Sequence, residues 1–435
     1  MPRVALHTLG CKLNYAETTT IGKQFIDRGF DIVPFGEETD VCVINTCSVT
    51  ERADRECRQM IRRARRTSRD PFVVVTGCYA QLEPEEIASI EGVDLVLGAK
   101  EKFELFHHAN DFRKGWYAKV CVSDIGSVDT FGPAFSTSAT DRTRAYLKVQ
   151  DGCDFNCTFC TIPLARGTSR SQSVGETLAQ ARMLVEGGYR EIVLTGVNVG
   201  DYGKKSGTGL IGLLRELVQI DGLERLRISS IEPNLLSQEI IDFTAESPVM
   251  CNHFHIPLQS GNDQVLRGMR RRYTTRLYED LIRRIRQRIP ECGIGVDVIV
   301  GFPGETPAQF EETYRFLNEI PVSYLHAFTY SERPNTPAVS YTQPVEPRER
   351  FRRNAMIRVL GQKKKHSFYS SMIGRRLPVL TESECEGPFR FGLTDNYVRV
   401  GLPARVAENT VVATELTGMT DGYCVGVVAE KEMAG

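Results

Sequence analysis

The chain of 435 residues lacks the features that mark secreted and membrane-spanning proteins. It opens MPRVALHTLG, without a basic segment followed by an apolar one. No uncharged apolar run approaches the roughly 18 residues that a membrane span needs. Its 13 cysteines are too few for a disulfide scaffold, and their number is odd. Internal repeats and low-complexity tracts are also missing. We therefore expect a cytoplasmic protein without a membrane partner, whose cysteines stay reduced.

The net charge of -1 conceals three strongly basic segments. Residues 52–69 carry a net charge of +6, and residues 267–288 and 347–366 each carry +7. Such segments form either solvated helix faces or a surface for a polyanion such as a nucleic acid. For a single segment a solvated face is the commoner explanation, but three basic segments in one chain modestly favour nucleic-acid binding.

Hydrophobic periodicity predicts three structured parts, within the two to four domains expected at roughly 150 residues each. Residues 1–112 alternate strands and helices, which predicts an α/β domain with a parallel sheet. Residues 113–142, rich in Ser, Thr, Gly and Asp, predict a linker or flap. Residues 143–372 repeat the alternation six times, which predicts a partial or closed (β/α)6 barrel. Residues 373–435 contain short strands and turns, which predicts a small antiparallel β-barrel.

The central part has the clearest pattern. Its expected strands are Ala145–Gln150, Glu191–Thr195, Arg225–Ser229, His253–Leu258, Gly295–Val300 and Tyr324–Tyr330. The expected helices between them are Val174–Glu186, Leu210–Gln219, Ser237–Ala245, Leu277–Ile289 and Pro307–Glu319, and Arg348–Tyr369 follows as one long basic helix.

The most specific local motif is Cys153-Asp-Phe-Asn-Cys157-Thr-Phe-Cys160, which directly follows a predicted strand. Thiolates are soft ligands, and three at this spacing can converge on one iron–sulfur cluster. A tetrahedral zinc site needs four protein ligands, and no fourth Cys or His lies within reach along the sequence. Three ligands leave one iron of a cluster open to bind a cofactor.

Three further cysteines, Cys11, Cys47 and Cys78, each follow a predicted strand, in the segments HTLGC, INTC and VTGC. The residues that follow parallel strands meet at one edge of the sheet. We therefore predict a second site with three thiolates at this edge. Unrelated loop cysteines are the alternative explanation.

The Cys153–Cys160 loop and the six β/α units after it resemble radical S-adenosylmethionine (SAM) enzymes. With the second set of cysteines and a terminal barrel laid out like a TRAM domain, the chain resembles the radical SAM methylthiotransferase family over essentially its whole length. The segments that carry this resemblance are HTLGCKLN, VINTCSVT, TGCYAQ, KVQDGCDFNCTFC, LTGVNVG, RLRISSIEP, HIPLQSGND, DVIVGFPGE and TYSERPNTPA.

The resemblance implies two 4Fe-4S clusters and SAM as cofactors. Catalysis would start at the cluster on Cys153, Cys157 and Cys160, where reduction of SAM yields a 5'-deoxyadenosyl radical that abstracts a hydrogen from an unactivated carbon. The auxiliary cluster, on Cys11, Cys47 and Cys78, would hold the sulfur. The implied partners are a tRNA anticodon stem-loop, an electron donor such as flavodoxin or ferredoxin, and a sulfur source that the sequence does not identify.

Family members differ in substrate. HTLGCKLN with Glu17-Thr18, INTCSVT and RTRAYLKVQDGC are most similar to the branch that acts at C2 of N6-threonylcarbamoyladenosine at position 37 of tRNA, giving the 2-methylthio derivative. The alternatives are the branch that modifies N6-isopentenyladenosine in tRNA and the branch that modifies a ribosomal-protein aspartate. A non-enzyme alternative is an RNA-binding protein with structural iron–sulfur sites.

Candidate SAM contacts lie at the ends of the barrel strands, where such sites are expected. They are Phe159 in the cysteine loop, Thr195 and Gly196 after the second strand, Ser229, Ser230 and Glu232 after the third, Gln259 after the fourth and Val300 at the end of the fifth. A glycine such as Gly196 allows close approach of backbone to a ligand. For each residue, an ordinary turn or helix-cap role is the alternative.

Other polar and aromatic residues have two explanations each. His253 and His255 share one face of a predicted strand, and we expect hydrogen-bonded histidines rather than metal ligands. Arg166 follows the cysteine loop and suggests contact with SAM or RNA phosphate, or a surface turn. Phe389, Phe391, Tyr397 and Tyr423 of the terminal barrel either stack on RNA bases or fill the barrel core.

Overall fold

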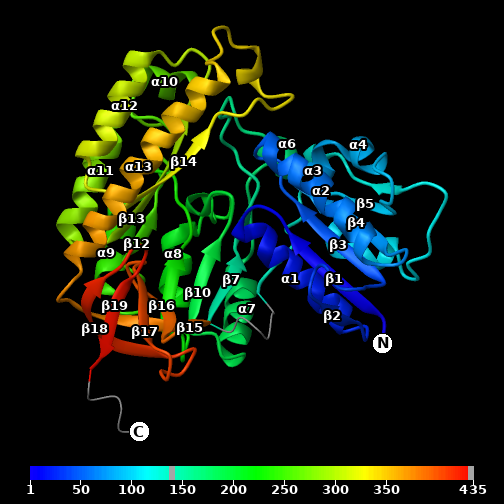
Figure 1. The fold of residues 1–435 in the computed structure, drawn as a ribbon, viewed down its shortest axis with the longest axis horizontal. Coiled ribbons are helices and arrows are strands. Elements are labelled where there is room, and N and C mark those ends of the chain that lie inside the picture. Colours follow the sequence, from blue (N-terminus) through cyan, green and yellow to red (C-terminus); the bar gives the residue numbers. More distant parts are fainter. Residues whose placement is uncertain (137–142, 430–435) are drawn as a thin grey trace.

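A computed structural model describes residues 1–136 and 143–429, and the chain forms three parts (Figure 1). The N-terminal part is a six-stranded parallel sheet in the order β2-β1-β3-β4-β5-β6. Its strands are β1 (Arg3–Thr8), β2 (Asp31–Val33), β3 (Val41–Thr46), β4 (Phe72–Gly77), β5 (Leu95–Leu97) and β6 (Lys119–Cys121). Every residue of β3 and β4 is buried, as expected for parallel strands covered on both faces.

The strand order of this sheet reverses at β1, which has β2 on one side and β3 on the other. Ligands of open α/β sheets bind at the carboxyl ends of the strands beside such a reversal. The helices that follow these strands are α1 (Lys12–Ile26), α2 (Glu51–Thr67), α3 (Cys78–Leu82) and α4 (Pro84–Ala88).

The predicted parallel α/β sheet of this part is confirmed, but β2 and β6 were not anticipated. Both have three residues, too few for periodicity to reveal. Strand β6 belongs to the segment 113–142 that was expected to be a linker or flap. Residues 137–142 of that segment lie outside the described residues.

The central part is a partial barrel of six parallel strands, with helices on its outside (Figure 1). One sheet contains β7 (Arg144–Lys148), β10 (Glu191–Thr195) and β11 (Arg225–Ile228), and the other contains β12 (His253–His255), β13 (Gly293–Val300) and β14 (Tyr324–Thr329). The sheets adjoin at β11 and β12, where Ile231 N donates to His255 O at 3.0 Å. Among the described residues β7 and β14 do not pair, so the barrel is open between them.

Helices cover the barrel strands in the predicted order. They are α7 (Val174–Glu186), α8 (Gly209–Leu217), α9 (Gln238–Glu246), α11 (Thr275–Arg288) and α12 (Pro307–Glu319), followed by the long α13 (Pro347–Ser371). Their apolar faces and the strands between them form one continuous core. The predicted partial (β/α)6 barrel is therefore confirmed. No helix in residues 1–136 and 143–429 combines the length and apolar character that crossing a bilayer requires.

The C-terminal part is a closed five-stranded barrel in the order β15-β16-β17-β19-β18. Its strands are β15 (Arg376–Glu386), β16 (Phe389–Thr394), β17 (Arg399–Pro403), β18 (Val411–Met419) and β19 (Cys424–Val428). The barrel was predicted to be antiparallel, and all its pairings are except β17 with β19, which is parallel. A closed ring with an odd number of strands cannot alternate direction throughout, so one parallel pair is unavoidable.

Two arginines of β11 attach the terminal barrel to the partial barrel. Arg225 Nη1 donates to Leu393 O and Arg227 Nη1 donates to Asp395 O, both at 2.8 Å. Glu191 of β10 accepts from Arg227 Nε at 2.7 Å, and this guanidinium lowers the pKa of the buried carboxyl to about 2 despite its burial. These contacts fix the terminal barrel against β11 of the partial barrel.

Candidate active site

A cavity of about 1120 Å³ lies where the three parts meet, and we call it the central cavity. Its lining includes the N-terminal cysteines Cys11, Cys47 and Cys78, the strand-end residues Thr195, Gly196, Ser229 and Ser230, and side chains of α13 and the terminal barrel. Residues distant in the sequence therefore face one common space.

The three N-terminal cysteines follow β1, β3 and β4, at the strand-order reversal. Their loops are tightly packed, because a Cβ atom on Gly10 would lie 2.8 Å from Cys47 Sγ. Burial, together with the nearby thiols of Cys78 and Cys11, raises the pKa of Cys47 to about 12. The structure thus brings together the three thiols that sequence spacing grouped.

The second set of thiols lies in the loop between β8 (Gln150–Asp151) and α6 (Ile162–Arg166). Burial raises the pKa of Cys153 and Cys160 to about 12, and the thiol of Cys157 acts on both in the same direction. Arg271 Nη1 donates to Cys157 Sγ at 3.0 Å and also pairs with Glu232. These buried neutral thiols need a cation to stabilise their thiolate forms, which an iron–sulfur cluster supplies.

The spacing of the side chains also bears on the choice of metal. In the described part of the chain, no three His, Cys, Asp or Glu side chains lie close enough together to hold a single metal ion. The thiols of each set nevertheless act on one another electrostatically. Each set consists of three cysteines, and thiolates are the ligands that hold iron–sulfur clusters.

The two cysteine loops touch each other. Thr161 Oγ1, beside Cys160, donates to the carbonyl oxygen of Ser48, beside Cys47, at 3.3 Å. Arg333, after β14, donates to Ser48 Oγ at 2.7 Å and to Asp54 of α2 at 2.6 Å. The partial barrel therefore holds the N-terminal cysteine loop directly.

Four of the candidate SAM contacts, Thr195, Gly196, Ser229 and Ser230, line the central cavity. Gly196 packs closely against Gln150, because a Cβ atom there would lie 2.9 Å from Gln150 Oε1 and 3.0 Å from Gln150 O.

The other four candidates lie elsewhere. Glu232 pairs with Arg271 beside Cys157, and Phe159 packs in the apolar group that contains Met269. Gln259 has a left-handed backbone (φ 69°), and its buried Oε1 has no hydrogen-bond partner among the described residues. Val300 is fully buried in the barrel core. The unpartnered Gln259 oxygen is available to a ligand that donates hydrogen bonds.

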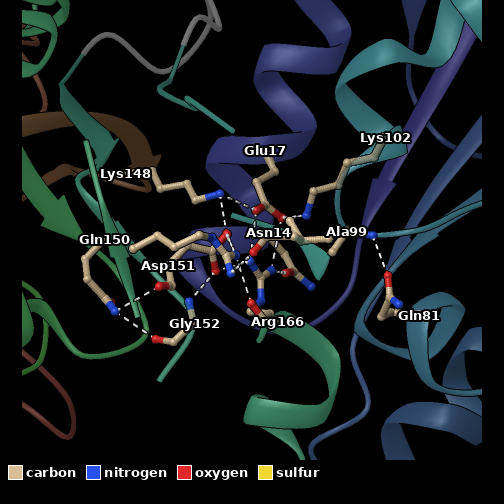
Figure 2. Close-up of polar contacts among 12 residues, drawn as sticks. Asn14, Glu17, Gln81, Ala99, Lys102, Lys148, Gln150, Asp151, Gly152 and Arg166 are labelled. Atoms are coloured by element: carbon tan, nitrogen blue, oxygen red, sulfur yellow. Dashed lines mark hydrogen bonds and ion pairs between the residues drawn. The ribbon is translucent and has the colours of Figure 1, made fainter. Parts of the chain in front are cut away.

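An ionic network joins the N-terminal part to the cysteine loop of the barrel (Figure 2). It comprises Glu17, Lys102, Lys148, Asp151 and Arg166, all nearly inaccessible to solvent. Glu17 accepts from Lys102 at 2.6 Å, Lys148 at 3.0 Å and Arg166 at 2.9 Å. These three cations hold the pKa of Glu17 well below its usual value, against the effect of burial.

Arg166 differs from its sequence-based interpretation. It is only 2% exposed and is held by Glu17, Asp151 and Asn14, so it is not in a surface turn. Its guanidinium lines the central cavity but is occupied by protein partners. It therefore connects the two cysteine-bearing parts rather than offering a free contact to RNA phosphate.

The histidines are hydrogen-bonded, as expected. His253 Nε2 lies 2.7 Å from the Tyr324 hydroxyl, and His255 Nε2 lies 2.9 Å from Asp297 Oδ1.

The basic segments are partly internal, which neither sequence-based explanation anticipated. Arg353 of α13 is 2% exposed and pairs with Glu305 at 2.7 Å, while Arg350 pairs with Glu332 at 2.6 Å. Among the barrel aromatics, Phe391 is buried against Tyr423.

The sequence patterns did not single out three residues of the site, which are Lys12, Arg271 and Arg333. Lys12 directly follows Cys11 and lines the central cavity, which the motif HTLGCKLN could have suggested. Arg271 was hidden within the basic segment 267–288. Arg333 lies in TYSERPNTPA, and only the fold brings it to Ser48.

Two family models and several named proteins match this chain. Residues 147–317 match the model described as Radical SAM superfamily, and residues 3–98 match the one described as Uncharacterized protein family UPF0004. The threonylcarbamoyladenosine tRNA methylthiotransferase MtaB of Bacillus subtilis is 41% identical, with 92% of this chain and 90% of that protein covered. The protein of the same name from Aquifex aeolicus is 38% identical, with coverages of 92% and 96%. A tRNA-2-methylthio-N(6)-dimethylallyladenosine synthase of Cereibacter sphaeroides is 36% identical, with 87% of each chain covered.

Solved structures show the same fold. The radical SAM methyltransferase TsrM from Kitasatospora setae matches with a TM-score of 0.58 and 18% identity, covering 78% of this chain and 77% of that one. Membership in the Radical SAM superfamily implies a 4Fe-4S cluster and SAM as cofactors. From its identity to the named relatives over most of its length, the chain belongs to the radical SAM methylthiotransferase family.

Proposed function

We propose that this protein attaches a methylthio group to C2 of N6-threonylcarbamoyladenosine at position 37 of tRNA. It uses SAM and two 4Fe-4S clusters, one held by Cys153, Cys157 and Cys160 and an auxiliary one held by Cys11, Cys47 and Cys78. The similarity to proteins named for this reaction supports the choice of substrate.

The observation that carries the proposal is the shared central cavity. Cys11, Cys47 and Cys78 face the same space as Thr195, Gly196 and the serines that end β11. A base bound in this space would lie between the sulfur site and the SAM site, which removes most of the orientational cost of bringing the reactants together.

The bound cofactors supply hydrogen-atom abstraction from an unactivated carbon, the sulfur and the methyl group. The protein holds the loops that carry the thiols and keeps water from the site. Arg271 holds Cys157 and is itself oriented by Glu232. The buried contacts of Arg333 and the ionic network hold the two cysteine-bearing parts in a fixed position relative to each other.

The rim of the central cavity supports the assignment of an RNA substrate. Arg358 and Lys365 of α13 and Arg399 of β17 line it, and Arg358 is exposed. Cations at a cavity mouth attract phosphate groups. The terminal barrel would contact the anticodon stem-loop there, and an electron donor such as flavodoxin or ferredoxin would reduce the cluster from outside.

Nucleoside mass spectrometry of tRNA tests the proposal. The chain would be expressed in a host without its own methylthiotransferases, beside a Cys157→Ala control. A 2-methylthio derivative of N6-threonylcarbamoyladenosine should appear with the wild type and vanish in the control.

Other products would change the conclusion in defined ways. A methylthio derivative of N6-isopentenyladenosine would place the chain with relatives such as the Cereibacter sphaeroides synthase. If an iron-loaded protein gave neither nucleoside, the tRNA proposal would fail and a protein substrate would replace it.

A further inference from the structure

The charged side chains that line the central cavity are not balanced. Each acidic side chain of the lining is already paired with a cation or a histidine. The pairs are Glu382 with Arg144 at 2.7 Å, Glu384 with Arg399 at 2.7 Å and Asp297 with His255 at 2.9 Å. Further cations line the cavity without any carboxylate within ion-pair distance among the described residues, and these are Lys12, Arg358 and Lys365.

Lys12 is the one of these three unpaired cations that belongs to the N-terminal part. It is the first residue of α1, directly after Cys11, and its side chain is half-buried. In the part of the chain that the structure describes, its ammonium group makes no hydrogen bond to protein. The ring of Tyr397 lies 5.9 Å from Nζ to the ring centroid, and the cations Arg144 and Arg227 act on Lys12 together with the more distant carboxylate of Glu191, which Arg227 already holds. A partly desolvated cation among other cations is costly unless a ligand supplies the opposite charge.

The substituent of the proposed substrate carries such a charge. The threonylcarbamoyl group ends in a free carboxylate, whereas the dimethylallyl group is apolar and uncharged. We propose that Lys12 binds the carboxylate of the N6 substituent beside Cys11 and thereby selects an acidic modified adenosine. This inference rests on the proposed function and adds the residue that reads the substrate.

The position of Lys12 distinguishes it from the other two cations. Arg358 is exposed, and Lys365 lies on the same helix, so both suit the phosphates of an RNA chain. Lys12 directly follows Cys11 in the chain, and its side chain lines the cavity between the N-terminal cysteines and Tyr397, where the modified base would have to come for chemistry. A charged hydrogen bond formed there contributes more than the same bond in water.

The test compares two RNA hairpins that differ only in this charge. One carries N6-threonylcarbamoyladenosine, and the other carries the neutral carboxamide analogue at the same position. Dissociation constants of the iron-loaded protein are measured by fluorescence anisotropy without SAM, and single-turnover rates are measured with SAM. The variants are Lys12→Met, Lys12→Arg and, as the matched control, Lys365→Met.

The wild type should bind the acid about 10- to 100-fold more tightly than the amide, the range of one charged hydrogen bond. Lys12→Met should lose this preference by weakening the acid alone, and Lys12→Arg should restore most of it. Lys365→Met should weaken both hairpins equally, because a phosphate contact does not sense the substituent.

The contrary outcomes are distinct. An unchanged acid preference in Lys12→Met would overturn the inference. If the iron content or the electron paramagnetic resonance spectrum of that variant also changed, Lys12 would serve the auxiliary cluster rather than the substrate. If the wild type modified neither hairpin but did modify a third hairpin that carries N6-dimethylallyladenosine, the proposed function itself would fail.

Discussion

Replacing Glu17 by Gln removes the carboxylate on which three buried cations converge. Glu17 and Lys148 are fully buried, and Lys102 and Arg166 are nearly so. After the change, Lys148 and Arg166 keep Asp151, whereas Lys102 loses its carboxylate partner among the described residues. The network then carries one more uncompensated positive charge at the junction between α1 and the cysteine loop.

The expected cost follows from this geometry. Breaking a buried ion pair by removing one partner costs about 3–5 kcal/mol. Burial lowers the pKa of Lys102 even with Glu17 beside it, so Lys102 can give up its proton in the variant. The cost should therefore lie near the lower limit, about 3 kcal/mol, which raises the local opening equilibrium constant about 100-fold.

Hydrogen exchange followed by mass spectrometry measures this opening in the whole protein. Amides of α1 and β7 should exchange about 100-fold faster in Glu17→Gln than in the wild type. The matched control is Asp27→Asn, directly after the end of the same helix, which breaks only an exposed pair with Lys23 and should change exchange less than about threefold. If the two variants behaved alike, the network would not hold the two parts together.

Further variants test other parts of the structure. Cys157→Ala should lose about half of the bound iron if each set of thiols holds one cluster. The control is Cys57→Ala, which removes a buried thiol of α2 and should keep all of the iron. Equal iron contents in the two variants would contradict the assignment. Gly77→Ala should deplete the auxiliary cluster, because its Cβ atom would lie 2.4 Å from a β3 carbonyl oxygen and shift Cys78, while Gly175→Ala, in open space, should leave the iron content intact. Glu191→Gln should reduce the fall of the melting temperature at acid pH. The pKa of Glu191 in the folded protein is lowered to about 2, so the stability that its carboxylate contributes is present above the unfolded pKa of about 4.3 and is lost as the pH falls toward 2. If the melting temperature of that variant fell at acid pH as steeply as in the wild type, the Glu191–Arg227 pair would not stabilise the fold.

Much of the fold could be predicted from the sequence because it is encoded locally. Helices α7, α11 and α12 have amphipathic periods and capping residues such as Ser173, Thr274 and Thr306, which accept backbone hydrogen bonds at their starts. Strand β10 is a short apolar run, and its predicted bounds, Glu191–Thr195, match the structure. Strand β2 has three residues, two of them exposed, so no apolar run marks it in the sequence.

The two sets of cysteines also differ in how far a local sequence pattern reveals them. The spacing of Cys153, Cys157 and Cys160 is local, so the motif can be recognised from neighbouring residues alone. Cys11, Cys47 and Cys78 could be grouped only through an assumed parallel sheet, and the strand order β2-β1-β3-β4 supports that assumption.

The sequence by itself determined the order of strands and helices, the family and the residues of the cysteine motif, because each depends on neighbours along the chain. Only the tertiary structure decided what the charged residues do. Arg166, Arg271 and Arg353 looked like surface or RNA-binding residues, yet each is buried against a partner that is distant in the sequence. Lys12 looked unremarkable, yet it is one of the unpaired cations that line the central cavity. The role of a charge depends on its burial and on its partners across the fold, and neither is encoded in a local pattern.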